Sequence, residues 1–421
     1  MKNEIIIIGG GAAGMMAAYS AALAGGTAVV FEKNEKLGKK LYITGKGRCN
    51  FTNAVDIKDF MENIPRNPRF LYSAFSSFSN TDMIDLLSEN GVKTKIERGK
   101  RAFPYSDKSS DVIKALSRLL QKNGVSVRLN ENVRDIILED GSVKGIIKEN
   151  GERISSPAVI IATGGLSYPA TGSTGDGFEF SRKAGHNITA LSPSLVPFNC
   201  KEGYIFKMQG LSLKNVRLSL YSKENKKPVF SETGEMSFTH FGVSGPLVLS
   251  ASSLVSDALF GERLLGRIDL KIALSENDLK ERMIRETKKS PKRSMRTLLE
   301  DLLPRSMVPV FSEMLDFTKE RVLSELKKEE RDELIRLLKA FPFTVEGKRG
   351  YNEAVITKGG VAVNEIENKT MGSKKVKGLY FAGEVIDCDA LTGGFNLQIA
   401  WSTGFLAGRS AALFCQENSK D

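Results

Sequence analysis

The chain has 421 residues, which is enough for two or three domains with large apolar cores. No apolar run reaches the roughly 20 residues of a membrane span, and no signal peptide is evident, so we expect a soluble cytoplasmic protein without a membrane partner. Four scattered cysteines and two histidines argue against a disulfide framework and a metal site. The net charge of +11 favours an anionic partner, or is only a solvated basic surface.

The N-terminal stretch predicts a strand, a tight turn, a helix and a second strand. Residues 5–8 are four isoleucines, typical of a buried parallel strand. The glycines that follow have G-x-G-x-x-G spacing: Gly9, Gly11 and Gly14. The alanine-rich residues 15–24 predict a helix, and residues 27–31 predict a strand that ends at Glu32. This order is typical of a dinucleotide-binding site.

Each part of this stretch has a role if a dinucleotide is bound. Gly9 allows the tight turn, Gly11 lets the backbone approach a pyrophosphate, and Gly14 lets helix and strand pack closely. The helix N-terminus offers free N–H groups to phosphates, and Glu32 can accept hydrogen bonds from ribose hydroxyls. The alternative is a glycine-rich loop without a ligand, which does not explain the acid at the strand tip.

The next two hundred residues continue an α/β pattern. Residues 44–53 form a polar loop placed to wrap the rest of a cofactor, or merely a solvated surface loop. Residues 56–122 are mostly helical by pattern, with a break around 99–106. Further strands are predicted, the second and third joined by an Asp140-Gly141 hairpin turn: 125–129, 133–138 and 143–148. The apolar residues 157–165 should form another strand beside the first.

The remaining sequence indicates a discontinuous nucleotide domain with an insertion. Alternating β patterns occupy about 191–272, and a Leu-, Lys- and Glu-rich helical segment follows to about 340. Strands are predicted at 359–363 and 378–387, and a glycine pair leads into a helix at 400–415. We therefore expect an α/β, Rossmann-like domain, an inserted β-domain and a small helical subdomain. Their expected boundaries are 1–190 with 345–421, 191–274 and 275–344.

Several long motifs together identify a family resemblance. They are IIGGGAAG, KLGKKLYITGKGRCNFTN, ATGGLSYPATGSTGDGFEFSRKAGH, FTHFGVSGP, ITKGGV, TMGSK and GLYFAGEVIDCDALTGGFNLQIAWSTG. Over nearly the whole chain they resemble the YhiN/BaiN-like flavoproteins of the two-dinucleotide-binding-domain type, often described as NAD(P)/FAD-dependent oxidoreductases. The helical segment is the least distinctive part, and nothing is carried over to it.

The resemblance implies FAD, held non-covalently because no site for a covalent link is evident. Glu32 would hold the adenosine ribose, the backbone of Val133 the adenine, and the dipole of a helix from Ala400 would stabilise negative charge on the reduced flavin. The predicted cofactor residues are Gly9, Gly11, Ala12, Ala13, Gly14, Glu32, Lys33, Lys40, Gly47, Arg48, Cys49, Asn50, Val133, Thr163, Gly164, Gly165, Gly383, Glu384, Gly394, Phe395, Asn396, Leu397 and Gln398.

Members of such a family include reductases of a C=C bond conjugated to a carbonyl in oxo-bile acids, and reductases of a uridine in ribosomal RNA. Amine oxidation has also been proposed in the group, and a redox-sensing flavoprotein is a further class. The first two are one reaction type, in which flavin N5 delivers hydride and a protein acid protonates the other carbon. The small-molecule enone is our leading hypothesis, and ribosomal RNA is the alternative.

Three residues are candidates for the chemistry. Cys49 is the first candidate acid, or a packed cysteine in a tight loop. Arg48 could polarise a substrate carbonyl, or only contact the cofactor phosphate or solvent. His240 is the second candidate acid, or a histidine hydrogen-bonded inside the β-domain. We expect His186 to be structural, and Cys388 to lie near the cofactor without reacting.

Two further expectations concern partners. No second G-x-G-x-x-G with flanking strands is present, so NAD(P)H should act as a transient reductant without its own domain. A cation cluster in the helical segment could contact RNA phosphates or an anionic substrate, although it lacks aromatic residues for stacking bases. The cluster consists of Lys280, Arg282, Arg285, Lys288, Lys289, Lys292, Arg293 and Arg296.

Overall fold

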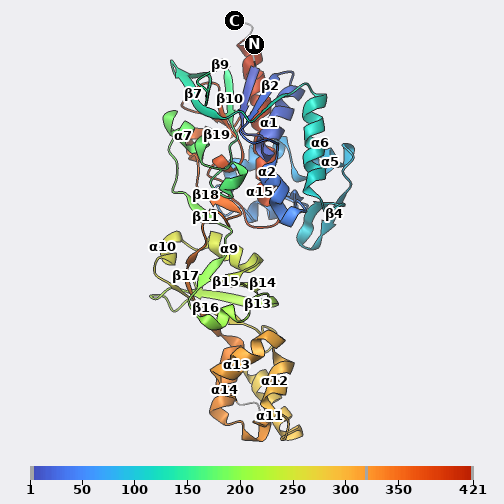
Figure 1. Ribbon diagram of the computed structural model, residues 1–421, viewed down its shortest axis with the longest axis vertical. Helices are drawn as coiled ribbons and strands as arrows, with labels where there is room; N and C mark the ends of the chain where they lie inside the picture. Colours follow the sequence, from blue (N-terminus) through green and yellow to red (C-terminus); the bar gives the residue numbers. More distant parts are fainter. Residues whose placement is uncertain (1–3, 318–320, 419–421) are drawn as a thin grey trace. The chain divides into compact units, whose positions relative to one another are not determined.

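The computed structural model describes residues 4–317 and 321–418, and the chain divides into two compact units (Figure 1). The first comprises Met1–Ser194 with Tyr351–Asp421, and the second comprises Leu195–Gly350. The expected boundary at 344/345 falls inside a strand of the second unit, β17 (Phe341–Lys348). The expected boundary at 190/191 lies a few residues before the limit of the first unit.

The first unit is built on a seven-stranded sheet with the order β19-β20-β21-β10-β1-β2-β6. Its parallel strands are β1 (Glu4–Ile8), β2 (Thr27–Glu32), β6 (Ser126–Leu129), β10 (Ala158–Ile161) and β21 (Leu379–Phe381). The short β19 (Ile366–Glu367) and β20 (Gly372–Ser373) add antiparallel pairs at one edge. Ile7 pairs with Val30 on one side and Ile160 on the other, which confirms that the strand predicted at 157–165 lies beside the first.

Two helices, α1 (Ala12–Leu23) and α15 (Phe395–Glu417), pack against each other next to this sheet (Figure 1). Their backbones approach closely because α15 has glycines at the crossing. A Cβ on Gly404 would lie 2.4 Å from the Ala13 carbonyl oxygen, and one on Gly408 would lie 2.0 Å from that of Ala17. Since α15 begins at Phe395, the predicted start at residue 400 is too late.

Smaller sheets and helices surround this core. The helices are α2 (Lys39–Ile43), α3 (Ile57–Glu62), α4 (Tyr72–Ser77), α5 (Asn80–Glu89), α6 (Ser109–Lys122) and α7 (Asp176–Lys183). The strands are β3 (Thr52–Asn53), β4 (Thr94–Glu97), β5 (Arg101–Pro104), β7 (Val133–Glu139), β8 (Ser142–Lys148), β9 (Arg153–Ser155), β11 (Ser192–Ser194) and β18 (Ile356–Lys358). The hairpin at Asp140-Gly141 is confirmed, with φ of 49° and 68°.

Two local predictions are wrong. Residues 94–97, expected to be helical, form the strand β4, while β5 lies within the break expected around 99–106, and both strands belong to one sheet with β3. No residue of β4 is buried, so this strand lacks an apolar pattern. Residues 359–363 form no strand, and the preceding strand β18 ends at Lys358. A Cβ on Gly359, whose φ is +88°, would lie 2.3 Å from the carbonyl oxygen of Ala190. The segment therefore makes a tight crossing that only glycine fits.

The second unit contains a closed six-stranded barrel. Its strands, in barrel order, are β12 (Phe198–Cys200), β15 (Gly242–Ser244), β14 (Phe230–Phe238), β13 (Ser212–Tyr221), β16 (Leu264–Asp269) and β17. Its short helices are α8 (Gly203–Phe206), α9 (Pro246–Leu254) and α10 (Asp257–Phe260). Between β16 and β17 lie the helices α11 (Glu276–Lys289), α12 (Met295–Leu302), α13 (Val308–Met314) and α14 (Lys328–Lys339).

The barrel and these helices share one apolar cluster. Leu218 and Phe343 from the barrel belong to it together with Leu299 and Leu338 from the helices. The helical segment is thus an insertion between two barrel strands. Within the described residues no helix is both long and apolar enough to cross a lipid bilayer.

Candidate functional site

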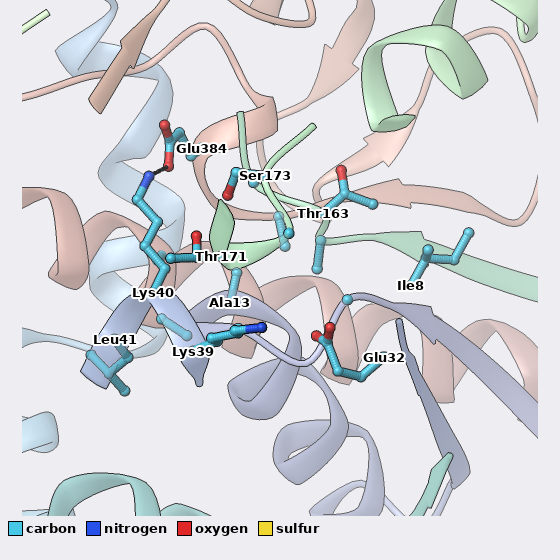
Figure 2. A pocket seen from close by; sticks show the side chains of 18 of the residues that line it. Ile8, Ala13, Glu32, Lys39, Lys40, Leu41, Thr163, Thr171, Ser173 and Glu384 are labelled. Atoms are coloured by element: carbon cyan, nitrogen blue, oxygen red, sulfur yellow. Dashed lines mark hydrogen bonds and ion pairs between the residues drawn. The ribbon is translucent and has the colours of Figure 1, made fainter. Parts of the chain in front are cut away.

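A pocket that is partly open to solvent lies in the first unit where β1, β2 and β10 end and α1 begins (Figure 2). Its wall is completed by α2, by residues 131–133 and 171–176, by residues around Ile356, and by the first turns of α15. Ligands of open α/β sheets bind at the carboxyl ends of the strands, and this pocket lies there. The sequence motif and the pocket therefore coincide.

The three motif glycines have different surroundings. A Cβ on Gly9 would lie 2.6 Å from the Ala162 carbonyl oxygen, and one on Gly14 only 1.8 Å from that of Gly9. Neither position can carry a side chain without moving backbone. At Gly11, by contrast, a Cβ would meet no protein atom within 4 Å, although Gly11 lines the pocket. The protein itself does not require glycine there, whereas an approaching pyrophosphate would.

Glu32 is fixed at the tip of β2 by three N–H donors. Its Oε2 accepts from the Gly10 amide at 2.7 Å, and its Oε1 accepts from the Asn34 amide at 2.8 Å and from Asn34 Nδ2 at 2.7 Å. The side chain lines the pocket, and the residue is only 8% exposed. A carboxylate has about four acceptor positions, so one remains for a ribose hydroxyl.

Residues 171–176 fold over the same end of the pocket, a contact that the sequence did not predict. Lys33 Nζ donates to Asp176 Oδ2 at 2.6 Å, and Asn34 Nδ2 donates to the Thr171 carbonyl oxygen at 3.0 Å. Thr171 and Ser173 face the pocket in Figure 2. The only sequence signal was the density of glycine and hydroxyl residues between 167 and 185.

A buried polar network lies at another part of the wall. Lys40 Nζ donates to Glu384 Oε2 and to Ser167 Oγ, each at 2.6 Å, and Figure 2 shows the first of these contacts. Glu384 Oε1 accepts from Ser167 Oγ at 2.6 Å and from the Thr357 amide at 2.9 Å. The Glu384 side chain is 11% exposed, so this ion pair is shielded from water more than a surface pair. Val355 and Ile356, next to Thr357, also line the pocket without any sequence signal.

The start of α15 contributes the remaining wall. Asn396 and Leu397 line the pocket, and Asn396 Nδ2 donates to the Ala390 carbonyl oxygen at 2.7 Å. Gln398 points elsewhere, because its buried Oε1 accepts from Thr52 Oγ1 at 2.7 Å. Phe395 packs edge-on against Phe60. The helix α15, and with it the helix dipole, therefore begins at Phe395. Residues 395–398, which were expected to form a turn before the helix, are its first turn.

The pocket brings together a large part of the predicted cofactor set. The predicted residues that line it are Gly9, Gly11, Ala12, Ala13, Glu32, Lys33, Lys40, Val133, Thr163, Gly164, Glu384, Asn396 and Leu397. Those outside its lining are Gly14, Gly47, Arg48, Cys49, Asn50, Gly165, Gly383, Gly394, Phe395 and Gln398. Lining residues that sequence reasoning missed include Asn34, Lys39 and Thr44. Among the described residues no cluster of His, Cys, Asp and Glu could hold a metal ion.

The predicted catalytic residues Cys49 and Arg48 are engaged away from the pocket. Cys49 is fully buried, and burial raises the pKa of its thiol to about 12, so the structure favours the packed-cysteine alternative. The Arg48 guanidinium donates to Glu97 and Asp107 and lies over the Phe103 ring at 4.2 Å. These hydrogen bonds raise the pKa of Arg48 and leave its guanidinium directed at carboxylates.

The other candidate groups have distinct environments. His240 belongs to the second unit, where it is exposed between β14 and β15 and lies edge-on to Phe241, so it is not a buried, hydrogen-bonded histidine of the barrel. His186 is buried beside Ser373 and Phe381, and burial lowers its pKa. Cys388 lines the pocket, and burial raises the pKa of its thiol well above the usual value.

The residues present fit a bound dinucleotide such as FAD. The turn at Gly9–Gly14 leaves space only at Gly11, the N-terminus of α1 faces that space, and the Glu32 carboxylate keeps one free acceptor position. Thr163 also lines the pocket, and its buried hydroxyl has no hydrogen-bond partner within the described ranges.

Comparisons with known proteins agree with this assignment. The family profile described as the HI0933-like protein Rossmann domain matches residues 3–410. A 3-dehydro-bile acid delta(4,6)-reductase of Clostridium scindens is 32% identical over 97% of this chain and 99% of its own length. A ribosomal RNA dihydrouridine synthase of Haemophilus influenzae is 32% identical over 97% and 98%.

Solved structures share the fold at low sequence identity. A 3-ketosteroid-delta4-(5alpha)-dehydrogenase from Rhodococcus jostii has a TM-score of 0.53 and 15% identity, with 97% of each chain covered. The FrdA subunit of Escherichia coli quinol fumarate reductase has a TM-score of 0.54 and 15% identity, covering 99% of this chain and 71% of its own. At such identity the likeness concerns the architecture alone.

Proposed function

This chain belongs to the HI0933-like Rossmann family and is an FAD-dependent oxidoreductase, and we propose that it reduces a C=C bond conjugated to a carbonyl group in a bile-acid- or steroid-like molecule. The observation that carries the proposal is the pocket at the glycine motif in a chain that is 32% identical, over 97% of its length, to a relative named as a bile acid reductase. Bound FAD would supply a hydride at N5, with NAD(P)H as the ultimate donor.

Different parts of the pocket would hold different parts of the cofactor. The Gly9–Gly14 turn and the N-terminus of α1 would bind the pyrophosphate, Glu32 the adenosine ribose, and Val133 the adenine through its backbone. The first turn of α15 and Glu384 would lie toward the flavin. No covalent link is needed, because the ribose and phosphate contacts are hydrogen bonds and dipole interactions.

The reaction also needs a proton for the carbon that does not receive hydride. We assign this role to Lys40, because its ammonium lies in the pocket wall and is held by Ser167 and Glu384. Two of the residues assigned from sequence have weaker positions, because Cys49 is buried in the core and Arg48 is paired with Glu97 and Asp107. A positioned general acid contributes roughly 10²–10⁴-fold to such a step.

The test is anaerobic reduction of the purified yellow protein with NADH and with NADPH, followed by reoxidation with a 3-oxo-4,6-diene bile acid. We expect catalytic reoxidation of the flavin and a product saturated at one conjugated bond. Lys40→Met should retain FAD and its reduction but reoxidise at least roughly 100-fold more slowly with the enone. The matched control is Lys36→Met, since the Lys36 ammonium lies 3.9 Å from Glu35 Oε1 and Lys36 does not line the pocket. A reduced flavin that no conjugated enone reoxidises would eliminate the proposal.

The alternative substrate is a uridine of ribosomal RNA, reduced by the same chemistry. Two relatives, each 32% identical to this chain, are named ribosomal RNA dihydrouridine synthases. The basic cluster of the helical segment also favours it, since Arg285, Lys288 and Lys289 are exposed on α11. Against this substrate, Arg293 forms ion pairs with Glu286 and Asp301, so fewer cations are available to phosphates than the sequence cluster contains.

The two substrates are separated by a genetic experiment. The gene is deleted, and dihydrouridine is quantified in ribosomal RNA. Loss of the modified base, restored by the wild-type gene but not by a variant with the exposed α11 cations changed to glutamine, would favour RNA. Unchanged RNA together with enone reduction by the pure protein would favour the small molecule.

A further inference from the structure

The outer face of the barrel carries a hollow that is independent of the FAD pocket. It lies where β13 ends at Tyr221 and where β16 runs beside it, with Tyr221 paired to Leu265 and Ser219 paired to Arg267. Along β16 the residues Leu264 and Ile268 are buried while Leu265 and Arg267 are exposed. This alternation turns the odd-numbered side chains outward, and the connection after β13 forms the rest of the hollow.

Positive charge dominates the lining of this hollow. Lys223 and Lys226 come from the connection after β13. Arg263 directly precedes β16, and Arg267 lies in β16. No carboxylate belongs to the lining. Arg267 lies over the Tyr221 ring at 4.7 Å. Arg263 has a loose contact with Glu346 at 3.8 Å, where both side chains are more than 40% exposed.

The two lysines are left without counter-charges. In the part of the chain that the structure describes, no carboxylate oxygen lies within 4.0 Å of the Lys223 or Lys226 ammonium. Glu224, in the same connection, does not line the hollow. Four cations converging on one surface hollow repel one another, so an anion in the hollow would relieve an unfavourable interaction.

A buried hydroxyl lies beside the hollow but is not accessible from it. Ser222 is 6% exposed and lines the hollow, yet its Oγ is buried without a hydrogen-bond partner among the described residues. Because this oxygen is closed off from the hollow, an anion there would contact the four cations and not the hydroxyl.

We propose that this hollow is a phosphate-binding site on the barrel. Guanidinium groups match the oxygens of phosphate bidentately, and lysines add point charge, so two arginines and two lysines suit a group of charge near −2 better than a single carboxylate. The phosphate could belong to a nucleic acid backbone or to a small phosphorylated molecule. The site requires neither FAD nor the proposed enone reaction.

Two probes distinguish the sources, both used with the full-length holoenzyme. Binding of a fluorescein-labelled oligouridylate of eight nucleotides is followed by anisotropy at several KCl concentrations, and binding of inorganic pyrophosphate is followed by calorimetry. The variant is Lys226→Gln/Arg267→Gln, and the control is Lys122→Gln/Lys144→Gln, which removes two exposed cations from the first unit.

For a nucleic acid ligand, the variant should bind the oligonucleotide on the order of tenfold more weakly, and its log–log salt slope should be shallower by about 1.4, or about 0.7 per lost contact. For a small phosphorylated ligand, pyrophosphate binding should be lost in the variant. The control should match wild type in both arms, and FAD content should be unchanged in every variant. Absence of binding in both arms, or equal weakening in variant and control, would overturn the proposal.

Discussion

Replacing Gly11 by valine should abolish FAD retention and leave the apoprotein folded. A Cβ at this position meets no protein atom within 4 Å, and the backbone angles of φ −79° and ψ −166° are extended values that valine adopts. Gly11 is the N-cap of α1, where an apolar residue costs about 1 kcal/mol, while loss of glycine's freedom in the unfolded chain returns about 0.4–1 kcal/mol. The free energy of unfolding should therefore change by less than about 1 kcal/mol.

Gly14→Ala is the matched comparison within the same motif. Its Cβ would lie 1.8 Å from the Gly9 carbonyl oxygen, so backbone must move, at a cost of at least about 1–3 kcal/mol. At roughly 2–4 °C per kcal/mol, this variant should melt several degrees below wild type even without FAD. Comparing Gly11→Val with Gly14→Ala therefore separates loss of cofactor binding from loss of folding stability.

The assay combines two measurements on each protein. Visible absorbance after gel filtration gives the FAD content, and thermal melting with and without added FAD gives its stabilisation. At roughly 100 times Kd, FAD should stabilise wild type by about 2.7 kcal/mol, and Gly11→Val should show no such shift. Full FAD content in Gly11→Val would refute the approach of a ligand to this glycine. An apoprotein as unstable as Gly14→Ala would mean that Gly11 serves packing instead.

Three further predictions follow from single side chains. Glu32→Gln leaves one of the three N–H donors facing an amide NH₂, so the free energy of unfolding should fall by about 1–3 kcal/mol. FAD binding should also weaken in an equilibrium titration. An unchanged stability together with an unchanged FAD affinity would contradict this geometry. A hydrogen bond from Arg48 lowers the pKa of Glu97, and hydrogen bonds from Lys95 and then Arg48 lower the pKa of Asp107, so the melting temperature of Arg48→Gln should lie below wild type at pH 7. The difference should begin to shrink at the usual carboxyl values of 4.5 and 3.8 and vanish only below the lowered pKa values, with FAD content equal throughout. Burial raises the pKa of Cys49 from 9.0 to about 12, so the contribution of the neutral thiol to the free energy of unfolding is complete below pH 9 and is lost above it at about 1.4 kcal/mol per pH unit. The alkaline fall in the free energy of unfolding should therefore be shallower in Cys49→Ala. Iodoacetamide at pH 8 should spare Cys49 in the native protein.

The sequence by itself determined the nucleotide-binding start of the chain. The isoleucine run, the glycine spacing and Glu32 lie within about thirty residues, and each acts through local rules: a buried strand, a turn that excludes side chains, and an acid at a strand tip. The same local reasoning placed the strand at 157–165 beside β1 and the hairpin at Asp140-Gly141. It failed at 94–97, where a short strand has no clear apolar period, and at 359–363, where a β-like composition forms a tight crossing.

Only the tertiary structure decided which polar side chains reach the pocket. Lys40 and Glu384 are 344 positions apart, and Lys33 and Asp176 are 143 apart, so no local pattern links either pair. Conversely, Arg48 and Cys49 sit in a segment that looked functional, but distant partners such as Glu97 and the packed core engage them. The backbone conformation of a short segment follows from its own residues, whereas the target of a charged or buried side chain depends on which distant segments the fold brings to it.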